Sequence, residues 1–174
     1  MTSNKKILQG SGLDDQTENE FYRKFNHEFN GLRGKKLDCH FIRRKDLPQL
    51  HEKADYLIVR APFRRSEKLL TALAKGIWIL PEAFIRKVIK DEKWHEVKEF
   101  DIGNVGYDRN PDQTELHFPL YIKRFTLKKN GGIFRNECAV VLLKEVGLKE
   151  RFQRILAAGG AKTLSRTVQH LVDR

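Results

Sequence analysis

Apolar residues in the first part of the chain follow two patterns, short runs and helical stripes. A run at residues 7–8 ends at Gly10-Ser11-Gly12, which indicates a short strand and a tight turn. Asp14 and Asp15 can begin a helix that extends to about Asn30, because their carboxylates accept the first free amide protons. The aromatic spacing along this helix predicts one buried stripe, made of Phe21, Phe25, Phe29 and Leu32.

The elements expected over residues 37–91 continue the pattern. Alternating apolar residues at 37–41 predict a second strand, and the continuous run at 56–59 predicts a strand buried on both faces of a parallel sheet. Helices are expected at 66–75 and 81–91, with a strand carrying a buried Trp78 between them. Their inward residues are Leu69, Leu70 and Leu73, then Phe84, Ile85, Val88 and Ile89. The order predicts an α/β fold, a four-stranded parallel sheet flanked by helices.

The same pattern starts again after a segment rich in Gly, Asn, Asp and Pro at 104–113. A buried strand is expected at 139–143, a helix at 148–158, and further strands at 161–164 and 168–172. We expect a first domain at 1–103, a linker at 104–133 and an incomplete second domain at 134–174. One sheet face of the incomplete domain would lack cover. The chain is therefore expected to be a fragment or short isoform, or else to be completed by a partner or by self-association.

The formal charge of +11 is unevenly distributed. Residues 121–174 are strongly basic, whereas 101–120 are acidic. A basic surface attracts phosphate groups on a peptide or on nucleic acid, and charge alone favours neither over a solvated face without a ligand. The basic cluster suited to nucleic-acid contact comprises Lys123, Arg124, Lys128 and Lys129.

Several functional classes lack their sequence signatures. No apolar run approaches the roughly 20 residues that span a bilayer, and no secretory signal is recognisable. Cys39 and Cys138 lie far apart and are expected to be buried thiols of a reducing compartment. The histidines lack metal-ligand spacing, and no paired carboxylates, Ser-His-Asp set or phosphate-binding Walker loop is present. We therefore expect no enzyme activity, no metal, no cofactor and no membrane partner.

The stretch at 54–100 resembles the C-terminal half of a BRCT repeat, in its strand–helix–strand–helix order and in Gly76-x-Trp78 between helix and strand. The first repeat would span 6–100, and part of a second would begin at 134. Phe84 occupies a position where many BRCT repeats carry Trp. BRCT repeats are usually docking modules of DNA-damage proteins, and many bind phosphoserine. The resemblance implies a BRCT fold followed by a partial second repeat.

The resemblance also implies a phosphate site. In phosphopeptide-binding BRCT pairs, a hydroxyl and the next Gly amide after the first strand hold the phosphate with a Lys of the second helix; here these are Ser11, Gly12 and Lys68. Such donors suit a phosphate, which accepts strong charge-assisted hydrogen bonds. Arg65 and Leu70 match positions that contact the peptide.

The function implied is a nuclear docking module of the DNA-damage response that binds a partner protein at phosphoserine. The alternatives are a DNA-binding BRCT module and a phosphate-independent interaction scaffold.

Overall fold

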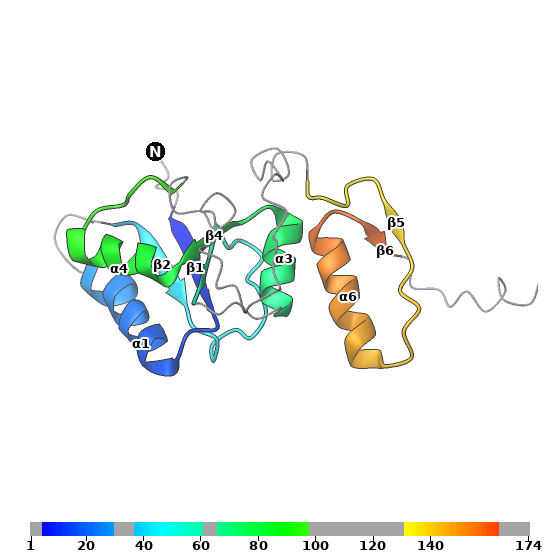
Figure 1. The fold of residues 1–174 in the computed structure, drawn as a ribbon, viewed down its shortest axis with the longest axis horizontal. Helices are drawn as coiled ribbons and strands as arrows, with labels where there is room; N and C mark the ends of the chain where they lie inside the picture. Colours follow the sequence, from blue (N-terminus) through cyan, green and yellow to red (C-terminus); the bar gives the residue numbers. More distant parts are fainter. Residues whose placement is uncertain (1–4, 30–36, 61–65, 98–130, 164–174) are drawn as a thin grey trace, which may run out of the picture.

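A four-stranded parallel sheet forms the centre of the first unit (Figure 1). The computed structural model describes residues 5–29, 37–60, 66–97 and 131–163. The strands lie in the order β2-β1-β3-β4, where the bounds are Lys6–Ser11 for β1, Cys39–Ile42 for β2, Tyr56–Val59 for β3 and Trp78–Pro81 for β4. All three neighbouring pairs are parallel. The predicted sheet is confirmed.

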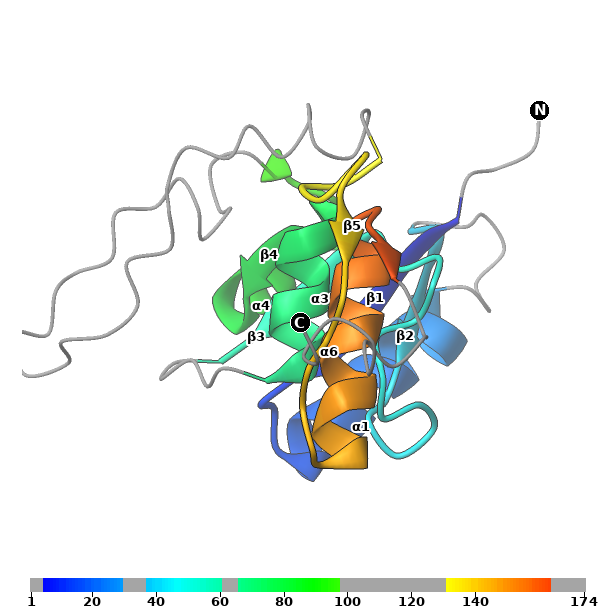
Figure 2. The same cartoon turned by 90° about the vertical axis from the view of Figure 1, so that its right-hand side faces the viewer.

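Helices cover both faces of this sheet (Figures 1 and 2). On one face, α1 (Asp15–Arg23) continues into a π-helical turn, η1 (Lys24–Glu28), and lies beside α4 (Glu82–Asp91). On the other face lies α3 (Glu67–Lys75). Each face therefore has its own apolar cluster, as expected for strands that are buried on both sides.

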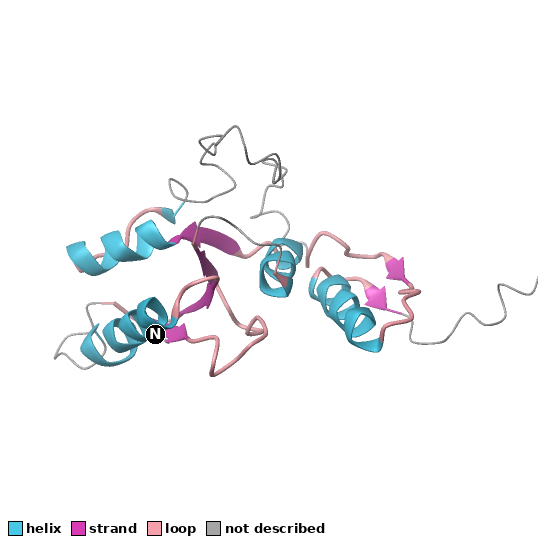
Figure 3. Ribbon diagram, turned by 60° about the horizontal axis from the view of Figure 1, so that its bottom comes forward, coloured by secondary structure: helices cyan, strands magenta, loops and turns pink. Residues whose placement is uncertain are grey.

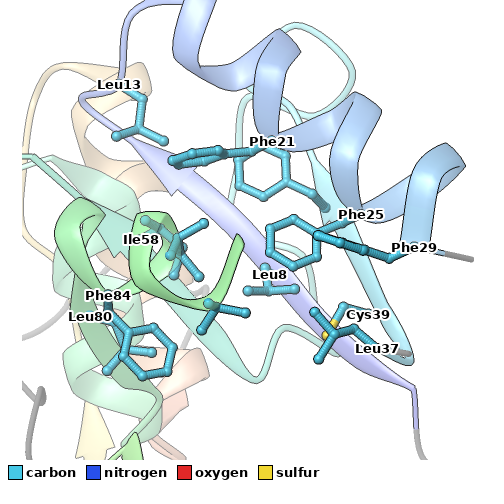
Figure 4. Close-up of a cluster of buried hydrophobic side chains, with 13 residues drawn as sticks. Leu8, Leu13, Phe21, Phe25, Phe29, Leu37, Cys39, Ile58, Leu80 and Phe84 are labelled. Carbon is cyan, nitrogen blue, oxygen red and sulfur yellow. The ribbon is translucent and has the colours of Figure 1, made fainter. Parts of the chain in front are cut away.

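The larger cluster contains the predicted aromatic stripe (Figure 4). Phe21 and Phe25 are fully buried, Phe29 nearly so, and Phe21 packs edge-on against Phe41 of β2. Leu32 lies outside the described residues. Phe84 is also fully buried and packs edge-on against Trp94, with ring centroids 5.3 Å apart. An aromatic pair thus fills this part of the core.

The helix that carries the stripe ends in a π-helical turn, in which a backbone amide donates to the carbonyl five residues earlier. The backbone amide of Phe29 donates to the carbonyl of Lys24. Asn26, within η1, donates to the carbonyl of Phe41 and accepts from its amide, both at 2.9 Å. This side chain satisfies backbone groups of β2, an edge strand of the sheet.

Trp78 is only half-buried, so the prediction of a buried Trp78 is wrong. Trp78 is the first residue of β4. This strand lies at the other edge of the sheet and therefore has a neighbouring strand on one side only. Ile79 and Leu80 take the buried positions instead, one on each face. The strand itself lies where the pattern predicted.

The second unit packs against the first through two helices (Figures 1 and 3). Its helix α6 (Val146–Ala158) lies beside α3, and its strands β5 (Cys138–Ala139) and β6 (Lys162–Thr163) form a short parallel pair. Residues 104–130 of the expected linker at 104–133, and the strand expected at 168–172, lie outside the described residues. The domain boundaries accordingly stay a prediction.

Two expectations about this unit are wrong. The strand predicted at 139–143 ends at Ala139, the last residue that pairs with β6 in the described part of the chain, and Leu142 is 76% exposed. Cys138 is exposed, unlike Cys39, because it lies in this small two-stranded sheet. The exposed large apolar side chains of the described residues all lie within residues 131–163, and all but Ile133 belong to the second unit: Ile133, Val140, Leu142, Leu143, Val146 and Phe152.

Glycines allow a close backbone crossing at the end of α6. The carbonyl of Gly159 accepts a 2.7 Å hydrogen bond from the amide of Phe134. A Cβ atom on Gly132 would lie 2.4 Å from that carbonyl oxygen, and one on Gly160 would lie 2.3 Å from the carbonyl oxygen of Gly131. Both Gly132 and Gly160 have positive φ, so only glycine fits the crossing without strain.

Candidate functional site

Polar groups converge at the carboxyl end of the central strands, where open parallel sheets usually bind ligands. Ser11 is the last residue of β1, and it lies opposite Val59, the last residue of β3. The chain then turns through Gly12, whose φ of 75° is the left-handed conformation that suits glycine. A Cβ atom there would meet nothing within 4 Å, so the requirement is conformational rather than steric.

The start of α3 brings a second hydroxyl to Ser11. Ser66 is the N-cap of α3, and its Oγ accepts a 3.2 Å hydrogen bond from the amide of Leu69. The Oγ atoms of Ser11 and Ser66 are 3.1 Å apart and share a hydrogen bond in which either can donate. Helix N-termini attract anions because their free amides and the helix dipole both favour negative charge.

Lys68 adds a buried ammonium group. Its side chain is only 6% exposed, and Nζ donates to the carbonyl oxygen of Gly10 at 3.3 Å. An ammonium has three protons to donate, and within the described residues Gly10 is the one acceptor that contacts it. We call Ser11, Gly12, Ser66 and Lys68 the hydroxyl–lysine cluster.

Burial controls the protonation of Lys68. Loss of water around the ammonium lowers the pKa of Lys68 to about 8; the Glu18 carboxylate opposes this shift and Arg44 adds to it. Glu18 is itself buried, with Oε2 accepting from the amide of Arg44 at 2.8 Å. Within the described residues, the other oxygen of Glu18 has no hydrogen-bond partner. Gly10 makes room for it, since a Cβ atom there would lie 2.9 Å from that oxygen.

The turn after Ser11 is held in place from both sides. Leu13 is buried in the core, and Asp14 caps α1 by accepting from the amide of Thr17 at 2.7 Å. Arg60, just after β3, forms ion pairs with Asp14 and Glu82 and donates to the Thr17 hydroxyl at 2.8 Å. The hydrogen bonds of Glu82 and Asp14 raise the pKa of Arg60, which keeps it charged.

The second unit lies next to the same helix terminus. Glu67, between Ser66 and Lys68, receives two hydrogen bonds from Arg154 of α6, at 2.7 and 3.2 Å. Arg151 lies 3.9 Å from the same carboxylate. Leu70 is half-buried and, by helical spacing from Glu67, lies on the α6-facing side of α3.

The predicted site residues therefore divide into three groups. Ser11 and Lys68 converge with Gly12 at the end of β1, whereas Leu70 lies toward α6. The residues that lie outside the described part of the chain are Arg65, Lys123, Arg124, Lys128 and Lys129. The hydroxyl of Ser66 is not among the predicted site residues, although a Ser directly before a helix is a recognisable cap signal. Glu18 and Arg60 act through contacts distant in sequence, for which no local signal exists.

Other site types find no support among the described residues. No group of three or more His, Cys, Asp or Glu side chains there can hold a metal ion. None of the helices that the structure describes combines the length and apolarity needed to cross a membrane. Burial raises the pKa of Cys39 to about 12, which keeps this thiol protonated and unreactive.

The fold is similar to that of a solved BRCT pair. The S. pombe Brc1 BRCT5-BRCT6 domains superpose with a TM-score of 0.59 at 14% sequence identity, covering 98% of this chain and 72% of that one. No protein-family model matches the sequence, and no curated protein matches it either. The chain thus has the α/β fold of BRCT domains, with a four-stranded parallel sheet flanked by helices.

Proposed function

We propose that this chain is a phosphoserine-peptide docking module, which links a nuclear DNA-repair protein to a phosphorylated partner. The observation that carries the proposal is the hydroxyl–lysine cluster: two hydroxyls 3.1 Å apart and a buried ammonium at the N-terminus of α3. A phosphate dianion accepts from hydroxyl, amide and ammonium donors together. Lys68 Nζ contacts one acceptor, the carbonyl of Gly10, within the described residues, so its remaining protons can be donated to a phosphate.

The wider setting also supports this assignment. The chain shares its fold with a BRCT pair, and its LeuAspCys-x-PheIle, SerGluLys and TrpIleLeu segments resemble the tandem BRCT region of the localisation factor of the SMC-type DNA-repair complex. We infer a similar role, in which the module reads a phosphorylated protein and performs no catalysis itself. Recognition by phosphate capture is a recurring mode of peptide binding.

A phosphoserine-oriented peptide library, screened beside its dephosphorylated copy, tests the proposal. Calorimetry on the best peptide should then show a loss of roughly ten- to a hundredfold in affinity for Lys68→Ala, because a charge-assisted hydrogen bond is worth about 1.5–3 kcal/mol. Ser11→Ala should lose less, since the Gly12 amide remains. Lys90→Ala is the matched control, because Lys90 is an exposed lysine of α4, on the other face of the sheet.

Two outcomes would contradict the proposal. Equal affinity for the dephosphorylated peptide would indicate a phosphate-independent scaffold. Binding to DNA that weakens steeply with salt, together with indifference to peptide phosphorylation, would indicate a nucleic-acid module.

A further inference from the structure

The N-cap position of α3 carries a second potential role, because its hydroxyl is itself a phosphate acceptor. Ser66 Oγ already contacts the hydroxyl of Ser11 and the amide of Leu69. We propose that Ser66 is a phosphorylation site, and that its phosphate occupies the hydroxyl–lysine cluster in cis and closes it to peptides. This inference rests on the proposed function, since it uses the same donors.

The geometry favours a phosphate on this oxygen. A phosphoserine N-cap places its oxygens next to the first free amides of the helix, which is the stabilising position for such a group. The Ser11 hydroxyl lies 3.1 Å from the oxygen that would be modified. Lys68 lies two residues after Ser66, and its ammonium donates to the carbonyl of Gly10, the residue before Ser11. The same donors cannot also serve a phosphate on another chain.

The carboxylate next to Ser66 in the chain is already paired. Glu67 is the acid closest in sequence, and its carboxylate is already paired with Arg154 and approached by Arg151. In the sequence, Arg64 and Arg65 directly precede Ser66. Basic residues before a serine are a charge pattern by which protein kinases select substrates.

The chemical step is an ordinary phosphoryl transfer from ATP by a protein kinase. Ser66 Oγ forms a bond to the γ-phosphorus, and the bond from that phosphorus to the bridging oxygen breaks. ADP leaves, and the hydroxyl proton passes to the base of the kinase. The product carries close to two negative charges at neutral pH.

A chain with phosphoserine installed at position 66 during translation tests the closure. A tethered ligand competes at an effective concentration of about mM, so affinity for a phosphoserine peptide should fall by the ratio of that concentration to the dissociation constant of the phosphate, about a hundredfold for a constant of about 10 μM. The affinity should return after phosphatase treatment. Phosphoserine installed instead at position 90, an exposed residue of α4 on the other face of the sheet, is the control, because it adds the same charge away from the cluster. This control chain should retain affinity within about tenfold of the unmodified chain.

A second readout does not depend on peptide binding. In the phosphorylated chain, ³¹P NMR should show the second phosphate pKa below its usual value of about 6, and Lys68→Ala should restore that value. This result would hold even if no peptide bound the unmodified chain, which separates failure of the inference from failure of the proposed function. A phosphate that titrates normally and is indifferent to Lys68 would overturn the inference.

The modification itself is tested on the chain recovered from cells treated with a phosphatase inhibitor. Mass spectrometry of a digest that covers Ser66 should detect a phosphorylated form. Its absence from such a digest would overturn the assignment of Ser66 as a modification site.

Discussion

Phosphopeptide affinity should fall as pH rises through the pKa of Lys68. The phosphate needs the ammonium form, and burial places this pKa at about 8 rather than at the usual lysine value near 10.5. About nine-tenths of the lysine is protonated at pH 7 and about one-tenth at pH 9, so the affinity should drop roughly tenfold between these pH values. A solvated lysine would leave the affinity unchanged over the same interval.

The stability of the free protein should change in the opposite direction. The pKa of Lys68 is lower in the folded chain than in the unfolded chain, so the unfolded chain binds more protons between pH 8 and 10.5. The contribution of Lys68 to the free energy of unfolding therefore rises across this window. Below pH 8 the full cost of burying the charged group is present.

Calorimetry at several pH values, in buffers of different ionisation enthalpy, measures both affinity and proton uptake. Binding at pH 8 should take up about half a proton. Lys68→Arg is the control, because arginine stays charged throughout and its affinity should be flat from pH 7 to 9. A flat profile for the wild-type chain, or an equal drop in Lys68→Arg, would refute the reasoning.

Three further predictions concern packing and assembly. Phe84→Ala should lower the free energy of unfolding by about 3–5 kcal/mol, and Trp78→Ala should lower it by only about 1–2 kcal/mol, because Phe84 is fully buried and Trp78 is not. Equal shifts in the denaturant midpoint of the two variants would contradict this. Gly132→Ala should speed amide exchange in the second unit, whereas Gly147→Ala, whose Cβ meets nothing within 4 Å, should not. Light scattering should show concentration-dependent self-association, since the second unit exposes large apolar side chains; a stable monomer would argue against it.

The first unit could be predicted because its local signals agree with each other. The continuous run at β3, the Asp14 cap and the Phe21–Phe25 stripe each specify an element, and the sheet buries the apolar residues of these elements. The run at 139–143 carried the same strand signal. It failed because a strand needs a paired neighbour, and within the described residues β6 pairs with Cys138 and Ala139 alone.

The candidate site was predictable only in part, for a related reason. Ser11 and Lys68 were found because a family resemblance placed them in register, and Ser66 could have been found as a helix cap. Glu18, by contrast, raises the pKa of Lys68 although the two residues lie far apart in the sequence, and no spacing rule predicts such a contact. Contacts between residues far apart in sequence determine the charge state of this site, while local pattern determines its scaffold.

If the hydroxyl–lysine cluster binds phosphate as we propose, the arrangement around Glu67 links that binding energetically to the second unit. Consecutive residues at the start of α3 serve different neighbours: Ser66 and Lys68 belong to the hydroxyl–lysine cluster, and Glu67 pairs with Arg154 of the second unit. By thermodynamic reciprocity, a change in the position of the second unit alters the phosphate affinity by a certain factor. Phosphate binding alters the equilibrium between the positions of the second unit by the same factor. A partly exposed ion pair is worth about 0.2–1 kcal/mol, so this coupling amounts to a factor of about five at most. The module would act as a graded sensor of its neighbour's position, not as an on–off switch.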